Sequence, residues 1–193
     1  MYDSIDESIS RYVHLEPEER QLFHSLLKYK KVKKKTFLLQ EGEVCAFEAF
    51  ILKGCVRLYF IDKEGVETIL YFAVEGWWVS DLISFMDQQP SNQFIETIED
   101  CELLLLDFRS KVTLLERVPK MEKYYRILLQ RSIGVLQQRF YASVSQTAEE
   151  RYLAFIEKYP QVVQRVPQHQ IARYLGVSPE FLSKVKSSLF KKS

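Results

Sequence analysis

Apolar and polar positions follow two different repeats along the chain, one before Asp107 and one after it. Before Asp107, short runs of aromatic and aliphatic residues are bounded by turn signals, of which Gly54 and the DKEG at 62–65 are the clearest. Runs of this length and composition predict β-strands, and their close spacing favours an antiparallel roll or sandwich over a parallel sheet. The run at 56–61 alternates strictly, so we expect it to have one buried and one exposed face. The runs are TFLLQ, EAFILKG, CVRLYFI, VETILYFA, FIETIE and CELLLLD.

Helical spacing appears on both sides of these strands. Residues 15–29 carry one apolar stripe and have Pro17 in the first turn, which predicts a helix. The basic run KYKKVKKK that follows is interpreted as a solvated connector leading into a strand rather than as a nucleic-acid or lipid signal. After Asp107, RSKVTLLERV and TAEERYLAFIEK predict two further helices, and YPQVVQRVP breaks the pattern after the second.

The segment 119–145 predicts a long helix, because it contains no proline after Pro119 and carries one broad apolar face. A small β domain cannot bury so long a stripe, whereas the same helix of a second chain could. We therefore expect this helix to form a homodimer; the alternative is a core helix that packs across the β-roll. The face comprises Met121, Tyr125, Leu128, Leu129, Ser132, Ile133, Leu136, Phe140 and Val144.

The stretch QHQIARYLGVSPEFLSKVKS at 168–187 predicts two short helices joined by a tight turn. Gly176 stands where the chain must turn sharply, and Ser178 and Pro179 are favourable at the cap and first position of a second helix. The inward positions then agree with one bihelical unit, a helix–turn–helix. These inward positions are Ile171, Ala172, Leu175, Val177, Leu182 and Val185.

The outward polar residues of this unit are the candidate DNA-binding residues. In a helix–turn–helix the start of the second helix enters the major groove, and the start of the first can hold a phosphate. Glu180 could accept from a cytosine amino group, and Ser183 and Lys184 could donate to base edges or phosphate. The alternative is the polar surface of an ordinary helical hairpin. The candidates are Gln168, His169, Gln170, Ser178, Pro179, Glu180, Ser183, Lys184 and Lys186.

The overall composition and net charge say little about function, but the charge of the C-terminal segment is informative. The net charge of +1 over 193 residues says little, but residues 161–193 hold six Lys or Arg against Glu180 alone. Three scattered cysteines without a CxxC pair predict neither a zinc site nor a disulfide framework, so we expect small buried side chains in a reducing cytoplasm. The polar start and the absence of a long apolar run predict no secretion signal and no membrane partner.

The whole order resembles the Crp/Fnr family of bacterial transcription regulators. Three passages carry the resemblance: KGCVRLYFIDKEGVETILYFAVEGWWV, TAEERYLAFI and VPQHQIARYLGVSPEFLSKVK. It implies an α+β chain with a jelly-roll-like, cyclic-nucleotide-binding-like β-roll at 1–118. A dimerisation helix at 119–145 and an all-α helix–turn–helix domain at 146–193 would follow. It also implies a homodimer that binds double-stranded DNA, with RNA polymerase as a further partner.

The chain departs from the family pattern at two places. Members that bind cyclic AMP carry Gly-Glu-Leu and then an arginine that clamps the phosphate. Here Ser80-Asp81-Leu82 stands for the first element and Ser91-Asn92 for the second, so the arginine is missing. We therefore expect the β-roll to respond to a different small-molecule effector, or to none, rather than to cyclic AMP, and we expect no cofactor. The end SLFKKS is also too short for the usual β-hairpin wing, which leaves Lys186, Lys191 and Lys192 as candidates for the missing phosphate contacts.

Two alternatives to a DNA-binding regulator are a metal-dependent enzyme and a module that binds protein. A metal-dependent jelly-roll enzyme needs clustered histidines, and all three histidines here lie outside the predicted strands, so we expect no enzyme and no metal site. The rival to DNA binding is a ligand-sensing or protein-interaction β-roll whose helical tail binds protein.

Overall fold

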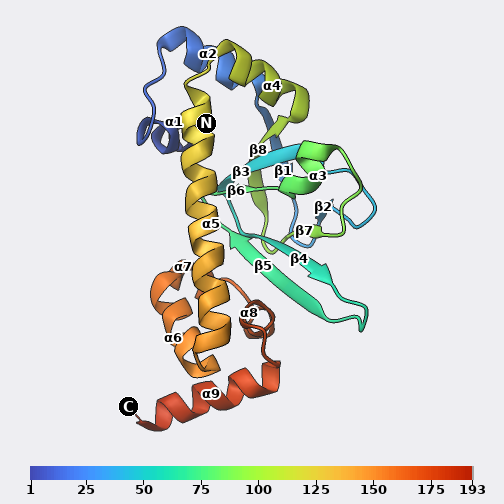
Figure 1. Cartoon of the computed structure of the whole chain (residues 1–193), viewed down its shortest axis with the longest axis vertical. Coiled ribbons are helices and arrows are strands. Elements are labelled where there is room, and N and C mark those ends of the chain that lie inside the picture. The colour runs from blue at the N-terminus through green and yellow to red at the C-terminus, as the bar shows by residue number, and fades with distance from the viewer. Residues whose placement is uncertain (193) are drawn as a thin grey trace. The chain divides into compact units, whose positions relative to one another are not determined.

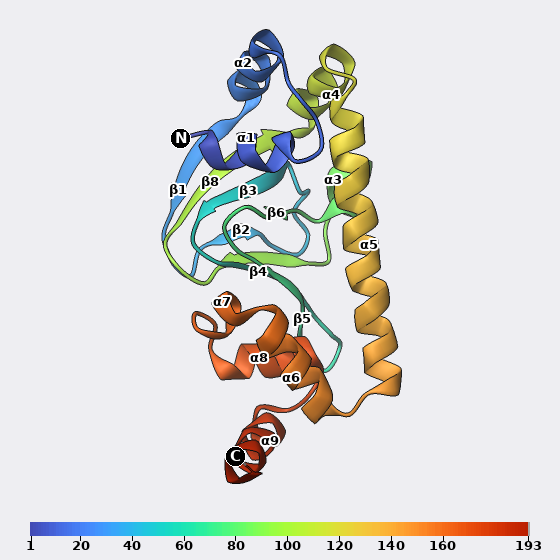
Figure 2. The same ribbon diagram turned by 90° about the vertical axis from the view of Figure 1, so that its left-hand side faces the viewer.

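The computed structural model describes the backbone of residues 1–192 and the side chains of residues 1–188. The chain divides into two compact units, which share the long helix α5 (Met121–Ser145). The N-terminal unit comprises Met1–Leu58 and Phe72–Ser132, and the C-terminal unit comprises Tyr59–Tyr71 and Ile133–Ser193. Figures 1 and 2 show the helices and strands of each unit in two views.

Eight short strands form two four-stranded sheets over the described residues, and six of them lie in the runs that predict strands. One sheet has the order β1-β8-β3-β6 and the other β2-β7-β4-β5. The pairs β1–β8, β2–β7, β3–β6 and β3–β8 are all antiparallel. This mixed helix and antiparallel sheet architecture is the predicted jelly-roll-like fold with helices at its C-terminal end. The strands are β1 (Lys28–Val32), β2 (Phe37–Leu39), β3 (Phe47–Lys53), β4 (Val56–Ile61), β5 (Glu67–Ala73), β6 (Trp78–Val79), β7 (Phe94–Thr97) and β8 (Cys101–Asp107).

Two predictions about the strands are wrong. The basic run at 28–35 is no connector, because its first five residues form β1, whose Tyr29 donates a hydrogen bond to Glu102 across the sheet. The strand at 56–61 is not half-buried, because the side chains of 56–59 are all buried, Arg57 included. A strand covered on both faces can keep an arginine only if that arginine is paired, and Arg57 pairs with Glu96 at 2.6 Å.

Gly54 closes the sharp turn between β3 and β4. Its φ is +103°, and a Cβ built there would lie 2.5 Å from the Sγ of Cys101. The backbone conformation and the close approach of β8 both require glycine at this position.

Helices pack on the β-roll in the N-terminal unit and bury its main apolar cluster. Side chains of α1 (Asp3–Ser10), α2 (Pro17–Leu26), α4 (Phe108–Arg117) and the start of α5 meet residues of β3 and β8 there. α2 lies against α4, and this pair is visible in both views (Figure 2). The helices at 15–29 and 109–118 are confirmed, whereas α1 and α3 (Leu82–Asp87) lie in segments where no helix was predicted.

The C-terminal unit is built from helices around the second half of α5, together with the β4–β5 hairpin at 59–71. Helix α6 (Ala148–Lys158) begins with a capping box, in which Thr147 and Glu150 each accept from the other's backbone N–H. The segment YPQVVQRVP contains a further short helix, α7 (Pro160–Val163), which the sequence interpretation missed. Helices α8 (Gln168–Leu175) and α9 (Pro179–Lys192) follow and contact each other.

Candidate nucleic-acid interface

The two helices of the predicted helix–turn–helix pack through the residues that the sequence places inward. Ile171, Ala172, Leu175, Leu182 and Val185 are all buried, and Ala172 and Leu182 have no exposed surface. The close contact of α8 with α9 is possible because alanine at 172 leaves room for the facing side chain.

The turn between the helices has the expected left-handed residue. Gly176 caps α8 at φ +68°, and the N–H groups of Gly176 and Val177 both donate to the carbonyl of Ala172. Since a side chain is strained at this φ, glycine stabilises the turn. Val177 is half-buried, so it covers the turn only in part.

Helix α9 begins as its sequence predicts. The Oγ of Ser178 accepts from the N–H of Phe181 at 3.1 Å, and Pro179 occupies the first helical position. Hydrogen bonds from its own backbone N–H and from Ser178 lower the pKa of Glu180, so its carboxylate is ionised at neutral pH.

One exposed face of α9 holds most of the predicted base-contacting residues. Pro179, Glu180, Ser183 and Lys184 line a shallow surface hollow together with Ser187 and Ser188. The face therefore offers a carboxylate acceptor, an ammonium donor and several hydroxyl groups along one side of a single helix. Groups of these kinds can read base edges or hold phosphate.

The remaining candidates lie at the start of α8, apart from Lys186, which reaches it from α9. The Nζ of Lys186 donates to the Oε1 of Gln168 at 3.3 Å, so Lys186 is directed to α8 rather than to the hollow on α9. His169 is exposed, whereas the Oε1 of Gln170 is buried without a hydrogen-bond partner among the described residues. The tail at 188–192 continues α9 as helix, and the side chains of Lys191 and Lys192 lie outside the described residues. No strand follows β8 in the part of the chain that the structure describes.

The predicted effector residues lie in the N-terminal unit, and the structure brings only some of them together. The carboxylate of Asp81 caps α3 by accepting from the N–H groups of Ile83 and Ser84. The hydroxyl of Ser91 donates to its other oxygen at 2.7 Å, and Ser80 donates to the carbonyl of Phe47. The carboxylate of Asp81 is thus already hydrogen-bonded within the protein, and a ribose hydroxyl would have to displace one of these bonds to bind it.

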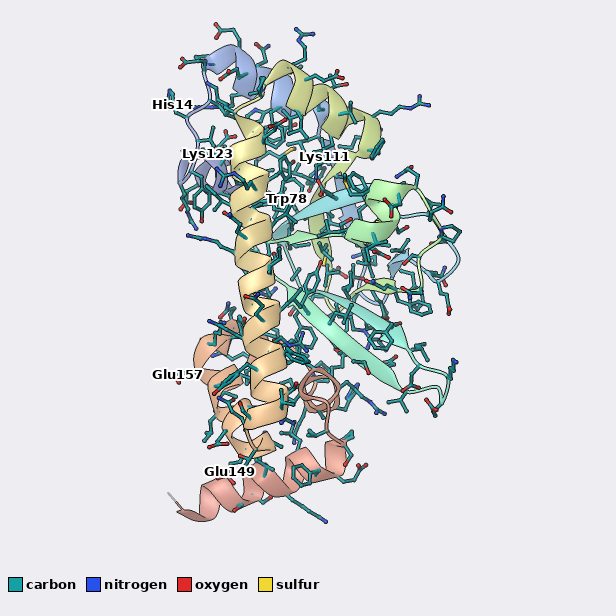
Figure 3. The ribbon with its side chains drawn as sticks, in the orientation of Figure 1. His14, Trp78, Lys111, Lys123, Glu149 and Glu157 are labelled. Carbon is teal, nitrogen blue, oxygen red and sulfur yellow. The ribbon has the colours of Figure 1, made fainter. Side chains whose placement is uncertain are left out.

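The other two effector candidates face outward. Leu82 is 44% exposed and Asn92 is exposed, so neither joins Asp81 and Ser91. Trp78, which is labelled in Figure 3, packs against Phe50 and Tyr125, and its Nε1 donates to the hydroxyl of Tyr124 at 2.9 Å.

A second buried ion pair was missed by sequence reasoning. The Nζ of Lys111 on α4 lies 2.6 Å from the Oε1 of Glu48 on β3, and both side chains are nearly inaccessible. The same ammonium lies 4.2 Å from the ring centroid of Tyr125 on α5. Burial raises the pKa of Glu48 by more than Lys111 lowers it. The pair could not be found from the sequence because its members are 63 residues apart and share no motif.

Among the described residues, no group of three His, Cys, Asp or Glu could hold a metal ion. Cys45, Cys55 and Cys101 are buried, as predicted, and the described residues contain no disulfide. Within the described chain, no helix has the length and hydropathy needed to cross a membrane.

The segment that forms the β-roll matches a known protein family. Residues 29–117 match the cyclic nucleotide-binding domain family. No curated protein sequence is similar enough to count as a match.

Solved structures share the fold over most of the chain. The c-di-GMP responsive global regulator CLP of Xanthomonas campestris is 16% identical, with a TM-score of 0.75 over 92% of this chain and 93% of that one. FixK2 of Bradyrhizobium japonicum is 18% identical, with a TM-score of 0.74 over 86% of this chain and 85% of that one. A Eubacterium rectale protein described as a transcriptional regulator of the Crp/Fnr family is 17% identical, with a TM-score of 0.72 over 92% and 85% of the two chains. These neighbours are transcription regulators rather than enzymes.

Proposed function

We propose that this chain is a transcription regulator that binds double-stranded DNA as a homodimer. Its residues 29–117 match the cyclic nucleotide-binding domain family, and its fold is that of Crp/Fnr regulators. In this proposal residues 1–118 form the sensor domain, 119–145 the dimerisation helix and 146–193 the DNA-binding domain. The protein acts in the cytoplasm, where DNA and RNA polymerase are its partners.

The observation that carries DNA binding is the α8–α9 unit. Its two helices pack on small and aliphatic side chains, and α9 presents Glu180, Ser183 and Lys184 on one exposed face. We assign base contacts to this face and phosphate contacts to the start of α8, where Gln168, His169 and Gln170 lie. Ser178 and Pro179 fix the start of α9, and Lys186 supports the phosphate contacts beside Gln168.

The observation that supports a homodimer is the apolar face of α5. Ile133, Leu136, Phe140 and Val144 are between 54% and 74% exposed, and Leu129 is 46% exposed. Their spacing of three or four residues makes a continuous stripe along one side of a helix. Exposed stripes of this kind are covered in stable proteins, and a second α5 carries the matching pattern.

The sensor in this proposal responds to an effector other than cyclic AMP. Asp81 and Ser91 are bonded to each other, and no arginine stands at the position where the family's phosphate clamp is expected. An anionic phosphate in a half-buried site without a cation would lose its main source of binding energy.

The experiment that tests DNA binding against the rival is a salt titration. Fluorescence anisotropy of a random-sequence duplex should show binding at low ionic strength that weakens steeply and log-linearly as salt is added, because counterions are released from phosphates. Absence of binding at low salt, or binding that does not respond to salt, would favour a helical tail that binds protein.

A further inference from the structure

A cavity of about 360 Å³ lies within the C-terminal unit. It is lined by the second half of α5, by α6 and by the end of α8. None of its lining residues belongs to the matched cyclic nucleotide-binding segment at 29–117 or to the exposed face of α9. Its size falls in the range of pockets that hold small ligands, roughly 300–1,000 Å³. The cavity is therefore a separate feature that the proposed function leaves unused.

Positive charge dominates the lining of this cavity. Arg139 comes from α5, and Arg151 and Lys158 come from α6, whereas no aspartate or glutamate is among the lining residues. The lining positions of α6 are 151, 154, 155 and 158, which follow one helical face. The acids of α6 fall on the other positions, Glu149, Glu150 and Glu157.

These three cations lack a carboxylate partner. None of the ion pairs found among the described residues includes Arg139, Arg151 or Lys158. Arg139 donates to the carbonyls of Leu70 and Tyr174, and Lys158 donates to the amide oxygen of Gln138 at 3.3 Å. These neutral acceptors form hydrogen bonds but do not neutralise the charge.

Arg151 has an unused donor as well as an unpaired charge. Its Nη1 donates to the carbonyl of Gln146 at 2.9 Å and its Nη2 to the carbonyl of Leu175 at 3.3 Å. Its Nε is buried and has no hydrogen-bond partner among the described residues. A buried donor of this kind is costly unless a partner is present, so the guanidinium has one N–H left to donate to an oxygen.

Aromatic rings form the other part of the lining. Phe155, Tyr159 and Tyr174 lie close together, with ring centroids 5.5 Å apart for Phe155–Tyr159 and 4.9 Å apart for Phe155–Tyr174. The guanidinium carbon of Arg139 lies 4.0 Å from the ring centroid of Tyr174. Flat apolar surface beside unpaired cations suits a ligand with a ring at one end and an oxyanion at the other.

We propose that this cavity binds a small aromatic oxyanion, a carboxylate or phosphate carried on a ring. The oxyanion pairs with Arg151 and Lys158, and the ring packs on Phe155 and Tyr174. The chain then has a ligand site in its C-terminal unit in addition to any in the β-roll. This inference does not depend on DNA binding, and it can be tested without DNA.

The test is isothermal titration calorimetry of the full-length protein at constant ionic strength, with phenyl phosphate and benzoate as separate probes. At least one of them should bind once per chain with a Kd below about 1 mM. Arg151→Gln should weaken that binding about tenfold or more, because a charge-assisted hydrogen bond is lost. Lys158→Gln should weaken it about threefold, since its ammonium is exposed.

Matched controls separate this site from general charge effects. Arg109→Gln on α4 and Lys123→Gln on α5 remove exposed cations of the N-terminal unit and should leave the affinity unchanged. Circular dichroism checks that Arg151→Gln is folded; if it is not, Lys158→Gln decides alone, because its only hydrogen bond found among the described residues is to Gln138.

Three results would overturn the proposal. The first is that neither probe reaches saturation. The second is that both cavity variants bind as tightly as the parent, and the third is that the two control variants lose as much affinity as the cavity variants. Inorganic phosphate serves as a third probe, and binding as tight as that of phenyl phosphate would contradict the role given to the aromatic rings.

Discussion

At the scale of single residues, buried charges are the least expected feature of this chain. Glu48 and Lys111 form an ion pair that is almost fully enclosed, and the Oε2 of Glu48 has no hydrogen-bond partner among the described residues. Burying both ions is expensive, and the pair is stable only while each member compensates the other.

Replacing one member of this ion pair should therefore lower the free energy of unfolding more than replacing both. Lys111→Met should lower the free energy of unfolding by about 3–5 kcal/mol near neutral pH, whereas Glu48→Gln with Lys111→Met should cost clearly less. Urea denaturation followed by circular dichroism measures both variants. Equal losses in the single and double variants would show that the pair is not coupled.

The burial of Glu48 predicts that the stability of the Lys111→Met variant depends on pH. Burial raises the pKa of Glu48 above that of the unfolded chain, and Lys111→Met removes the charge that opposes this rise. A raised acid pKa gives stability that is present at low pH and is lost as the pH rises through the folded pKa. The destabilisation by Lys111→Met should therefore shrink as the pH is lowered from 8 to about 5. A loss that stays constant over this range would contradict a buried, ionisable Glu48.

Two residues on α9 should affect DNA binding differently. Lys184→Ala should weaken binding to all duplexes and make the dependence on salt about one unit shallower, if its ammonium holds a phosphate. Glu180→Ala should mainly relax the preference at one base pair. Anisotropy titrations of a preferred and a scrambled duplex distinguish the two effects. Unchanged affinity in both variants would show that the exposed face of α9 is not the reading face.

The absence of an arginine at 91–92 predicts that the β-roll does not bind cyclic AMP. Calorimetry with cyclic AMP should show no high-affinity binding, because Asp81 is bonded to Ser91 and to the start of α3 and no clamp for the phosphate stands at 91–92. A micromolar or tighter site would overturn this argument.

At the scale of elements, the strands and long helices were predictable because their apolar spacing is strong. The runs EAFILKG at 48–54 and CELLLLD at 101–107 became the central strands β3 and β8. Of the predicted inward positions of α8 and α9, Ile171, Ala172, Leu175, Leu182 and Val185 are buried. Helix α6 buries mainly Tyr152 and Phe155, and its Leu153 is 41% exposed.

The elements that were missed have physical reasons. β1 is a strand of lysines, held by its antiparallel pairing to β8 rather than by its own propensity. β6 has only two residues, and α3 depends on its cap, Asp81, and leaves Ile83 and Met86 exposed. The pairing of Glu48 with Lys111 and of Arg57 with Glu96 arises only when distant strands and helices meet.

The apolar stripe of α5 predicts the effect of a charge on assembly. Ile133→Glu should convert a dimer to monomers, since a carboxylate would be buried opposite its own copy. Sedimentation velocity over a range of concentrations measures this. Lys123→Glu, on an exposed position of the same helix outside the stripe, is the matched control and should remain dimeric. A parent protein that is monomeric at all concentrations would contradict the role given to α5.

At the scale of the whole molecule, two compact units share the helix α5, and in the proposed homodimer a second copy supplies the two-fold symmetry. Each copy contributes one α9, so the DNA site should consist of two inverted half-sites. An effector bound by either unit could act only through its different affinity for the DNA-competent and DNA-incompetent arrangements of the dimer.

Selection of bound duplexes from a random pool tests this central claim most directly. The account predicts enrichment of a two-fold symmetric sequence, with half-site centres about 10–10.5 base pairs or a multiple apart, bound by two chains. Enrichment of a single unrepeated half-site, or no enrichment over the starting pool, would contradict a dimeric DNA-binding regulator.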